Sequence, residues 1–385
     1  GRQRGQIEVS IVNVVITRGF DDLVPRGYAK SLVSASTGIC KCSNHLVGKV
    51  TIITGGNKGI GYETAKNLAE RGARVILACR NEGLGIAARD KIIKATGNAD
   101  VHYRHLDLSS LASVRAFADG VIKTEKRLDI LINNAGVYEV DNVKTEDGLS
   151  LAVQTNHFGP FLLTNLLLPL LKTSAPSRIV NVASGAHRNG KVQFDNLNLE
   201  KETKESYSMF GVYSNTKLFN ILMTVELTRR LEGTGVTANS LHPGVVETEI
   251  LQLNSSWVKV LLPLAKYFIK DSWEGAQTSI YLAVSREVDG VSGKYYVDCK
   301  EAKVLTALAE DKNLARKLWE VSETLFLEVH PTSTKIFRSN VKNRTDVWVA
   351  RRGRSQKTSR INSRSLSTAV FAVFSVSIGP RKSQM

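Results

Sequence analysis

The sequence predicts an α/β protein with a doubly wound parallel sheet, covered by helices on both faces. Two observations predict it. Six short apolar runs alternate with longer segments of helical periodicity between residues 50 and 241. Each run is continuously apolar rather than alternating, which is typical of strands buried on both faces. Ligands bind such sheets beyond the carboxyl ends of the strands, so the residues that follow each run are candidates for a site.

The first strand, residues 50–54, is followed by a loop with three spaced glycines and then at once by a helical pattern. Gly55 allows a sharp turn, Gly59 lets a pyrophosphate come close, and Gly61 lets the helix pack on the strand. The N–H groups of the first helical turn then attract phosphates. Glycines at these spacings also occur in ordinary loops. The candidate cofactor-binding residues of this loop are Gly55, Asn57, Lys58, Gly59, Ile60 and Gly61.

The second strand, residues 73–79, completes a βαβ unit and ends in Arg80. A ribose with a free 2′-hydroxyl is bound by a carboxylate at that position, whereas a 2′-phosphate is bound by a cation. Arg80 and Lys58 are cationic, and no acidic residue follows the strand before Glu82. The pattern therefore favours NADP(H) over NAD(H). The alternative interpretation of Arg80 is a solvated charge at a strand end.

Helices and strands are expected to alternate along the rest of the chain. The expected helices cover residues 85–95, 111–124 (capped by Ser110), 148–171 and 212–232. The expected strands cover residues 101–106, 128–132, 178–183, 236–241 and 294–297. Unusual residues follow several strands, and we expect them to line one rim with the glycine loop: Arg80, Asp107, residues 133–136, Ser184, Pro243 and Gly244.

Hydride exchange with a carbonyl requires a group that exchanges a proton with the carbonyl oxygen. Tyr213 and Lys217 place a phenol and an ammonium group one helical turn apart. Because a nearby cation favours the phenolate, we expect the pKa of Tyr213 to be lowered. Ser184 would hydrogen-bond the substrate oxygen, and Asn156 would hold backbone and a relay water.

The Tyr-x-x-x-Lys spacing occurs three times, beginning at Tyr62, Tyr213 and Tyr296. Tyr62 lies on the helix after the glycine loop, where its side chain competes with packing. Tyr296 lies in a predicted strand, in which positions four apart are separated by about 13 Å. Only Tyr213 begins a helix just after a strand that ends in serine, so its context selects it.

These motifs together resemble the short-chain dehydrogenase/reductase family over about residues 48–330. The resemblance implies a Rossmann fold with a seven-stranded parallel sheet in a single catalytic domain. It rests on Thr54-Gly55-x-x-x-Gly59-Ile60-Gly61, Asn133-Asn134-Ala135-Gly136, Asn156, Ser184, Tyr213-x-x-x-Lys217 and Pro243-Gly244.

The resemblance also implies roles for residues. Tyr213 would be the acid/base, Ser184 would orient the substrate carbonyl, and Lys217 would also bind the nicotinamide ribose. With Asn156 these three would form a catalytic tetrad. Further cofactor contacts would come from Asp107, Leu108, Asn134, Ala135, Gly136, Pro243, Gly244, Val246 and Thr248.

Residues 78–81, 154–159 and 182–187, with the long gap between Ser184 and Tyr213, resemble the retinol dehydrogenase branch. Its microsomal members use NADP(H). The resemblance to this branch implies a lipophilic substrate such as retinal or retinol. Residues 261–265 would help to cover that substrate or would form a plain packing helix. The alternatives are another carbonyl substrate (a steroid, a lipid aldehyde or a quinone) and a non-enzymatic nucleotide-binding protein.

The composition of the 385 residues, 42% hydrophobic and 23% charged, is that of a soluble globular protein. The net charge of +16 is concentrated in residues 331–385, which hold 12 Lys and Arg against one acidic residue. We expect a disordered basic tail there, with contact to anionic lipid or nucleic acid as the alternative. No folded nucleic-acid motif accompanies the tail, so no specific nucleic-acid partner is expected.

Residues 1–47 are expected to form an N-terminal extension. The apolar stretch over residues 7–16 is interrupted by polar residues, and the one over residues 366–378 is too short for a membrane span. Members of the branch usually begin with a membrane-anchoring helix, which residues 1–37 lack. We therefore expect an intracellular protein, either cytoplasmic or at the endoplasmic reticulum by branch analogy, with peripheral membrane contact.

The four cysteines indicate neither a disulfide framework nor a metal site. The family often pairs through its long helices, and the resemblance therefore implies a homodimer.

Overall fold

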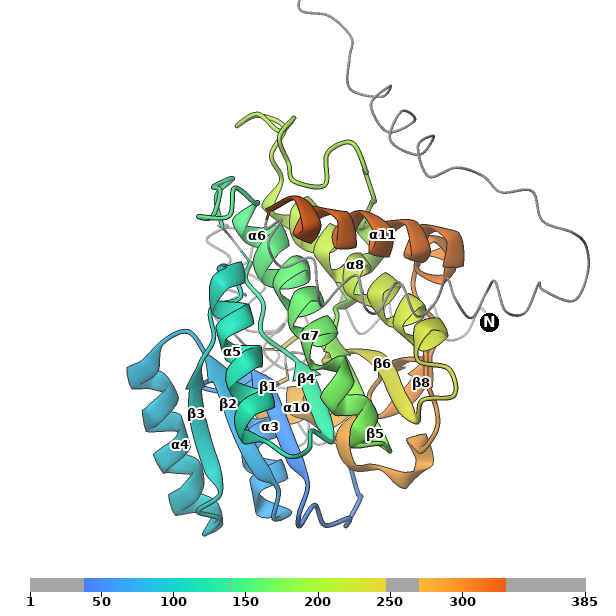
Figure 1. The fold of residues 1–385 in the computed structure, drawn as a ribbon. Coiled ribbons are helices and arrows are strands. Elements are labelled where there is room, and N and C mark those ends of the chain that lie inside the picture. Colours follow the sequence, from blue (N-terminus) through green and yellow to red (C-terminus); the bar gives the residue numbers. More distant parts are fainter. Residues whose placement is uncertain (1–37, 139, 247–269, 330–385) are drawn as a thin grey trace, which may run out of the picture. The chain divides into compact units, whose positions relative to one another are not determined.

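The computed structural model describes residues 38–138, 140–246 and 270–329, and every statement about the architecture refers to these residues. They form one sheet in the order β3-β2-β1-β4-β5-β6-β7-β8 (Figure 1). Its strands are β1 (Val50–Thr54), β2 (Arg74–Cys79), β3 (Val101–His105), β4 (Ile130–Asn133), β5 (Ser177–Val182), β6 (Val236–His242), β7 (Tyr295–Val297) and β8 (Lys300–Ala302).

The sheet has the seven parallel strands that the sequence predicts and one more. Strands β1 to β7 pair in parallel, whereas β8 pairs with β7 in antiparallel. A two-residue connection at Asp298 and Cys299, both with positive φ, joins β7 to β8. Only antiparallel neighbours can be joined by so short a turn. The short edge strand therefore extends the predicted sheet without changing its order.

Helices cover both faces of the sheet, as predicted for a doubly wound fold (Figure 1). The helices α3, α4 and α10 pack on one face, and α5, α7 and α8 pack on the other. The helices are α3 (Gly59–Glu70), α4 (Glu82–Thr96), α5 (Leu111–Thr124), α6 (Leu151–Val153), α7 (Gly159–Thr173), α8 (Met209–Arg230), α10 (Ser272–Val284) and α11 (Lys312–Val329).

The prediction of a single helix over residues 148–171 is wrong. Gly148 has a φ of 72°, which an α-helix cannot include, so helical structure begins only at α6. A π-helical turn, Gln154–Phe158, separates α6 from α7. Such turns insert a residue into a helix and are frequent at functional sites. This one carries Asn156.

Polar caps set the starts of α5 and α8. The helix α5 has its predicted bounds, because the hydroxyl of Ser110 accepts a hydrogen bond from the Ser113 amide at 3.3 Å. The helix α8 begins three residues earlier than predicted, at Met209, because Ser208 Oγ accepts from the Gly211 amide at 3.0 Å. Cap residues lie outside the apolar pattern, so the pattern alone places helix starts too late.

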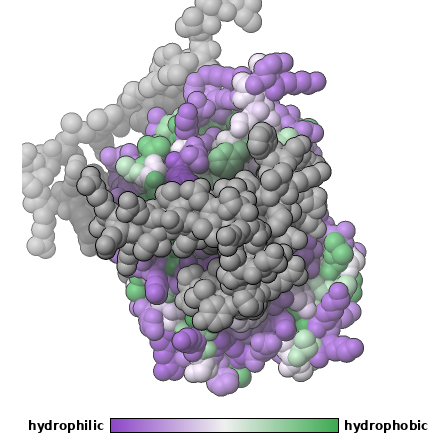
Figure 2. Space-filling model, turned by 180° about the vertical axis from the view of Figure 1, so that it is seen from behind, coloured by the Kyte–Doolittle hydropathy of each residue, from purple (hydrophilic) through white to green (hydrophobic). Residues whose placement is uncertain are grey.

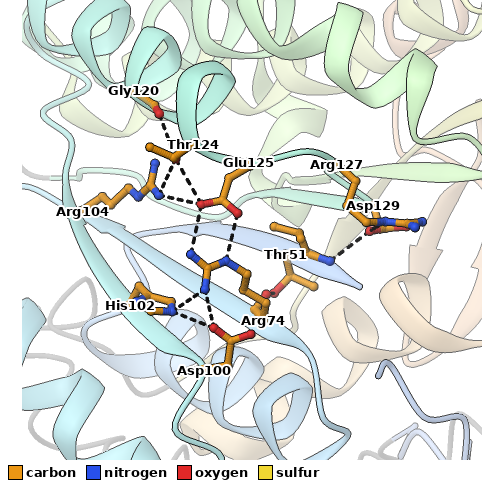
Figure 3. A network of polar contacts seen from close by, with 11 residues as sticks. Thr51, Arg74, Asp100, His102, Arg104, Gly120, Thr124, Glu125, Arg127 and Asp129 are labelled. Carbon is orange, nitrogen blue, oxygen red and sulfur yellow. Dashed lines mark hydrogen bonds and ion pairs between the residues drawn. The ribbon is translucent and has the colours of Figure 1, made fainter. Parts of the chain in front are cut away.

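An ion-pair network lies at the amino edge of β1 to β4 (Figure 3). Arg74 donates to both carboxylate oxygens of Glu125, at 2.9 and 3.2 Å, and Arg104 donates to the same carboxylate at 2.6 Å. Asp129 accepts from Lys49 at 2.9 Å. The cations hold the pKa values of the buried carboxyl groups of Glu125 and Asp129 below their usual range, against the opposing effect of burial. Because ligands bind these folds at the opposite edge, we assign this network to stability.

The last described helix, α11, packs across α8 (Figure 1). The Trp319 ring, which is 3% exposed, meets the Phe161 ring edge-on at 4.5 Å between centroids. The guanidinium of Arg230 lies 4.5 Å from the centre of the same Trp319 ring. Farther along α11, Ser322 Oγ lies 3.2 Å from His157 Nε2. The helix α11 therefore ties α7, α8 and the π-helical turn together.

Residues 38–47, the described part of the predicted N-terminal extension, lie against α10. The Cys40 amide donates to Gln277 at 3.2 Å, and Asn44 Nδ2 donates to the Val284 carbonyl at 2.6 Å. All four cysteines of the chain are free. The predictions for residues 7–16, Thr248, residues 261–265 and the basic tail lie outside the described residues.

Within the described ranges, no helix is both long enough and apolar enough to cross a membrane. Seen from behind, the described surface is mainly hydrophilic, with smaller apolar areas between (Figure 2). Apolar side chains scattered in this way are ordinary for a protein surface.

Candidate functional site

The loops after β1 and β4 lie side by side where the strand order reverses, which is the usual position of a ligand crevice in an open α/β sheet. Thr54 joins the two loops. Its Oγ1 accepts hydrogen bonds from the amides of Asn134 and Ala135, both at 3.0 Å. The side-chain amide of Asn134 donates to the Thr54 carbonyl at 2.9 Å. Thr54 is therefore a structural link to which the sequence alone assigned no separate role.

The spaced glycines have the geometry that the motif predicts. Gly55 and Gly59 have φ values of 67° and 57°, in the left-handed region that favours glycine. A Cβ at Gly61 would lie 2.3 Å from the Gly55 carbonyl oxygen and 2.6 Å from Asn134 Nδ2. The loop can therefore close against α3 only if position 61 has no side chain.

The N-terminus of α3 has no side-chain cap. Lys58 is its N-cap residue and makes no capping hydrogen bond, and the first turn has no acidic residue. The helices α4, α5, α8 and α10, by contrast, are each capped by a side-chain oxygen. The first-turn N–H groups of α3 thus suit a bound phosphate. Beneath the loop, burial raises the pKa of the Cys79 thiol to about 11, and the backbone of Gly56 and Asn57 opposes that rise.

Arg80 and Asp107 follow neighbouring strands. Arg80 is exposed and makes no hydrogen bond or ion pair with another described residue. Asp107 accepts from the Ser109 amide at 2.9 Å and from the Ser109 hydroxyl at 2.6 Å, which shapes the turn into α5. The neighbouring Leu108 is buried, and a Cβ at Gly159 would lie 2.5 Å from its carbonyl oxygen. Both polar residues lie on the predicted rim.

The end of β5 and the start of α8 bring Ser184 and Tyr213 together. The Ser184 side chain lies close enough to the Tyr213 phenol to act on its pKa, and Ser184 Oγ accepts from the Ala186 amide at 3.2 Å. Burial raises the pKa of Tyr213 above its usual value, and the Ser184 side chain only opposes that rise. The predicted lowering by Lys217 is therefore wrong, because desolvation of the phenolate dominates.

Lys217 lies under this pair and is 4% exposed. Its Nζ lies 5.4 Å from the centre of the Tyr213 ring and donates to the Val182 carbonyl at 3.1 Å. Burial lowers the pKa of Lys217 to about 8. A Cβ at Gly136 would lie 3.5 Å from Nζ, so the loop after β4 runs directly beside the amine.

The side chain of Asn156 forms hydrogen bonds with backbone groups, as the sequence predicts. Its Oδ1 accepts from the Val137 amide at 2.7 Å, and its Nδ2 donates to the Val137 carbonyl at 2.9 Å. Nδ2 also lies 3.1 Å from Thr216 Oγ1 on α8. The π-helical turn therefore connects the loop after β4 to the helix that carries Tyr213 and Lys217.

Tyr138 is a neighbour of the site that sequence reasoning missed. Its ring meets the Tyr213 ring edge-on, with centroids 5.1 Å apart and an interplanar angle of 79°. It follows the Asn133–Gly136 motif by two residues, and that nearness was the only signal in the sequence.

The chain after β6 reaches the same rim. Gly244 has a φ of 95°, and a Cβ there would lie 2.7 Å from Lys270 Cδ. Val246 is buried and forms a parallel bridge with Lys270. Pro243 is half-buried just after the strand.

The other two Tyr-x-x-x-Lys pairs lie away from this arrangement. The Tyr62 ring packs against the hydrophobic core from α3. Tyr296 is buried in β7 and packs against Tyr281 of α10 with centroids 6.1 Å apart. Only Tyr213 meets a serine at a strand end.

A family model described as short chain dehydrogenase matches residues 49–196. Retinol dehydrogenase 11 from Homo sapiens is 48% identical over 287 residues, which cover 74% of this chain and 88% of the relative. Retinol dehydrogenase 14 from Homo sapiens is 48% identical over 297 residues, with 72% and 86% covered.

Among solved structures, an uncharacterised protein from Mycobacterium paratuberculosis aligns with a TM-score of 0.60 at 35% identity, covering 76% of this chain and 96% of that one. The glycine loop, the Asn156–Ser184–Tyr213–Lys217 arrangement and these relatives agree. The chain belongs to the short-chain dehydrogenase/reductase family, in its retinol dehydrogenase-like branch.

Proposed function

We propose that this protein is an NADP(H)-dependent oxidoreductase that transfers hydride between the nicotinamide and the carbonyl or alcohol of a lipophilic substrate, retinal or retinol. The observation that carries the proposal is the placement of three groups: the Ser184 side chain lies close enough to the Tyr213 phenol to act on its pKa, and Lys217 Nζ lies 5.4 Å from the centre of the Tyr213 ring. Three groups that a carbonyl reduction needs thus meet beside a loop built for a dinucleotide.

The described residues fit a dinucleotide. The glycine loop leaves room for a pyrophosphate, and the uncapped first turn of α3 supplies N–H donors. Arg80 would pair with a 2′-phosphate, and Lys217 would bind the nicotinamide ribose. Asp107, Leu108 and residues 134–136 would contact the adenosine part, with Pro243, Gly244 and Val246 toward the nicotinamide. The bound cofactor supplies or accepts the hydride.

The protein's own residues would manage the proton. Because burial raises the pKa of Tyr213, its phenol is protonated at neutral pH and can donate to a carbonyl oxygen that becomes alkoxide. Ser184 would hydrogen-bond that oxygen and orient it. The Lys217 ammonium stabilises the phenolate that remains. Asn156 fixes the loop beside Lys217 through both backbone groups of Val137.

The substrate class is supported by the relatives, which are named retinol dehydrogenases. The test is NADPH oxidation by the purified chain with all-trans-retinal, a steroid ketone, a long-chain aldehyde and a quinone. We expect retinal to have one of the highest kcat/KM values. If the kcat/KM for retinal is far below the others, the substrate is assigned to the class of the carbonyl compound with the highest kcat/KM. No oxidation with any of them would support a non-enzymatic nucleotide-binding protein instead.

We further propose the domain division expected from the sequence, residues 1–47, 48–330 and 331–385. Peripheral membrane contact, with a location at the endoplasmic reticulum or in the cytoplasm, is proposed with it. A homodimer through the long helices would have to include α11, because α11 lies across α8. Cell fractionation and the molar mass in solution test these points.

A further inference from the structure

His187 is completely buried, with 0% of its surface exposed, three residues after Ser184 in the turn Gly185–Asn189. Both of its ring nitrogens are hydrogen-bonded. Nδ1 lies 2.6 Å from the Ser184 carbonyl oxygen, and Nε2 lies 2.9 Å from the Leu305 amide nitrogen. A carbonyl can only accept and an amide N–H can only donate, so the ring carries its proton on Nδ1 and is neutral.

The surroundings of His187 favour this neutral form. Burial lowers its pKa, and the neighbouring Arg188 lowers it further, against the opposing bond to the Ser184 carbonyl. His242, another histidine whose pKa burial lowers, lies close enough for the two rings to influence each other electrostatically. The Tyr295 ring of β7 meets the imidazole edge-on at 5.1 Å. The ring is therefore fixed on its flank as well as at both nitrogens.

The Ser184 carbonyl receives two donors from one residue. Besides Nδ1, the His187 backbone amide donates to it at 3.1 Å. A third bond, from the Ala186 amide to Ser184 Oγ, comes from the same turn. The turn is also tightly enclosed, because a Cβ at Gly185 would lie 3.3 Å from the His242 ring. The peptide plane after Ser184, and with it the direction of the Ser184 hydroxyl, is thus set by this turn.

We propose that His187 is a positioning residue for the reaction, which holds Ser184 in register with Tyr213 and is itself anchored by the Leu305 amide. The inference rests on the proposed function, because it assigns His187 a part in orienting the carbonyl. It also gives the segment between β8 and α11 a function: its backbone at Leu305 fixes the tautomer that Ser184 needs. Ser184 would touch the substrate, whereas His187 acts only through Ser184.

Two substitutions separate the two ends of the imidazole. In His187→Asn the amide nitrogen replaces Nδ1 and can still donate to the Ser184 carbonyl, but the bond from Leu305 is lost. In His187→Gln the amide oxygen replaces Nε2 and can accept from Leu305, but the bond to Ser184 is lost. We expect kcat to fall about tenfold in His187→Gln and to stay within about threefold of the wild type in His187→Asn. The KM for NADPH should not change in either.

Tyr281→Phe is the matched control, because it removes a 2.8 Å side-chain bond to Glu287 on the other face of the sheet. It should lower Tm to a similar extent and leave kcat unchanged. If kcat instead follows Tm in all three variants, or if His187→Gln keeps the wild-type kcat, His187 is only structural and the inference is overturned.

The tautomer gives a readout that needs no substrate. The ¹⁵N chemical shifts of His187 in the wild-type protein should show a protonated Nδ1 and an unprotonated Nε2. The opposite tautomer, or a titrating ring near neutral pH, would overturn the inference even in an active enzyme. A wild-type protein that reduces no carbonyl would overturn the proposed function, and the catalytic part of this inference with it, whatever the tautomer.

Discussion

The hydroxyl of Ser184 lies close enough to the phenol of Tyr213 to act on its pKa, although one follows β5 and the other lies on α8 beyond a long polar insertion. A carbonyl oxygen placed against both hydroxyl groups would be held and protonated by the same pair.

Tyr213→Phe removes the proposed proton donor and keeps the ring that packs edge-on against Tyr138. We expect kcat/KM for carbonyl reduction to fall about a thousandfold, while NADPH still binds in a fluorescence titration. Tyr296→Phe is the control, because it has the same Tyr-x-x-x-Lys spacing but lies on the far face of the sheet. Full activity in Tyr213→Phe would remove the basis of the assignment.

Arg80→Ala tests the cofactor preference. If Arg80 pairs with a 2′-phosphate, loss of the charge-assisted hydrogen bonds should raise the KM for NADPH by roughly tenfold to a hundredfold and leave the KM for NADH nearly unchanged. Arg316→Ala, which removes an exposed arginine on α11, is the control. An equal loss for both cofactors would show that Arg80 does not contact the 2′-phosphate.

Lys217 should set the basic limb of the pH profile for reduction. Burial lowers its pKa to about 8, so the ammonium that stabilises the phenolate is lost as the pH rises through that value. We therefore expect kcat/KM to decrease above about pH 8. Arginine stays charged, so Lys217→Arg should be slower but should move the limb to higher pH. A limb at the same pH in Lys217→Arg would assign it to another group.

Gly61→Ala should destabilise the protein and weaken NADPH binding. The added Cβ would lie 2.3 Å from the Gly55 carbonyl oxygen, and the loop must shift to admit it. We expect a loss of about 1 to 3 kcal/mol in the free energy of unfolding. Gly120→Ala on α5 is the control: its Cβ would meet nothing within 4 Å, and the change should stabilise by about 0.5 kcal/mol. Tight NADPH binding by Gly61→Ala would contradict the assigned pyrophosphate site.

The amino-edge network should make stability sensitive to acid. The folded-state pKa values of Glu125 and Asp129 lie below their ordinary values of 4.5 and 3.8. Their contribution is therefore complete at neutral pH and is lost as the pH falls below about 4.5 and through the folded-state values. Glu125→Gln should cost about 2 kcal/mol at pH 7 and flatten the acid limb in urea titrations.

Glu70→Gln is the matched control for this network, because its 3.9 Å pair with Lys66 is exposed. It should cost little and leave the acid limb unchanged. An unchanged acid limb in Glu125→Gln would show that other carboxyl groups control acid unfolding.

Local chemistry explains why so much of the fold could be predicted. The apolar runs of β1, β2, β4, β5 and β6 reflect burial on both faces, whereas β3 is buried only at Val101, and Ser110 marks the start of α5 in the sequence itself. The three glycines of the loop after β1 can be recognised in the sequence because their conformations and close contacts tolerate no side chain. The rim residues could also be expected together, since parallel strands all end at one edge.

The tertiary structure alone decided what depends on contacts between distant segments. The π-helical turn at Asn156 is held by Val137 and Thr216, neither of which its own sequence reveals. The pKa of Tyr213 rises because the fold buries the phenol, an effect that outweighs the charge one helical turn away. Burial keeps His187 neutral, and the Leu305 amide, far along the chain, binds Nε2 and so leaves the proton on Nδ1, which donates to the Ser184 carbonyl. The spacing of residues in the sequence shows which chemical groups are present, whereas burial and long-range hydrogen bonds determine their protonation states and orientations.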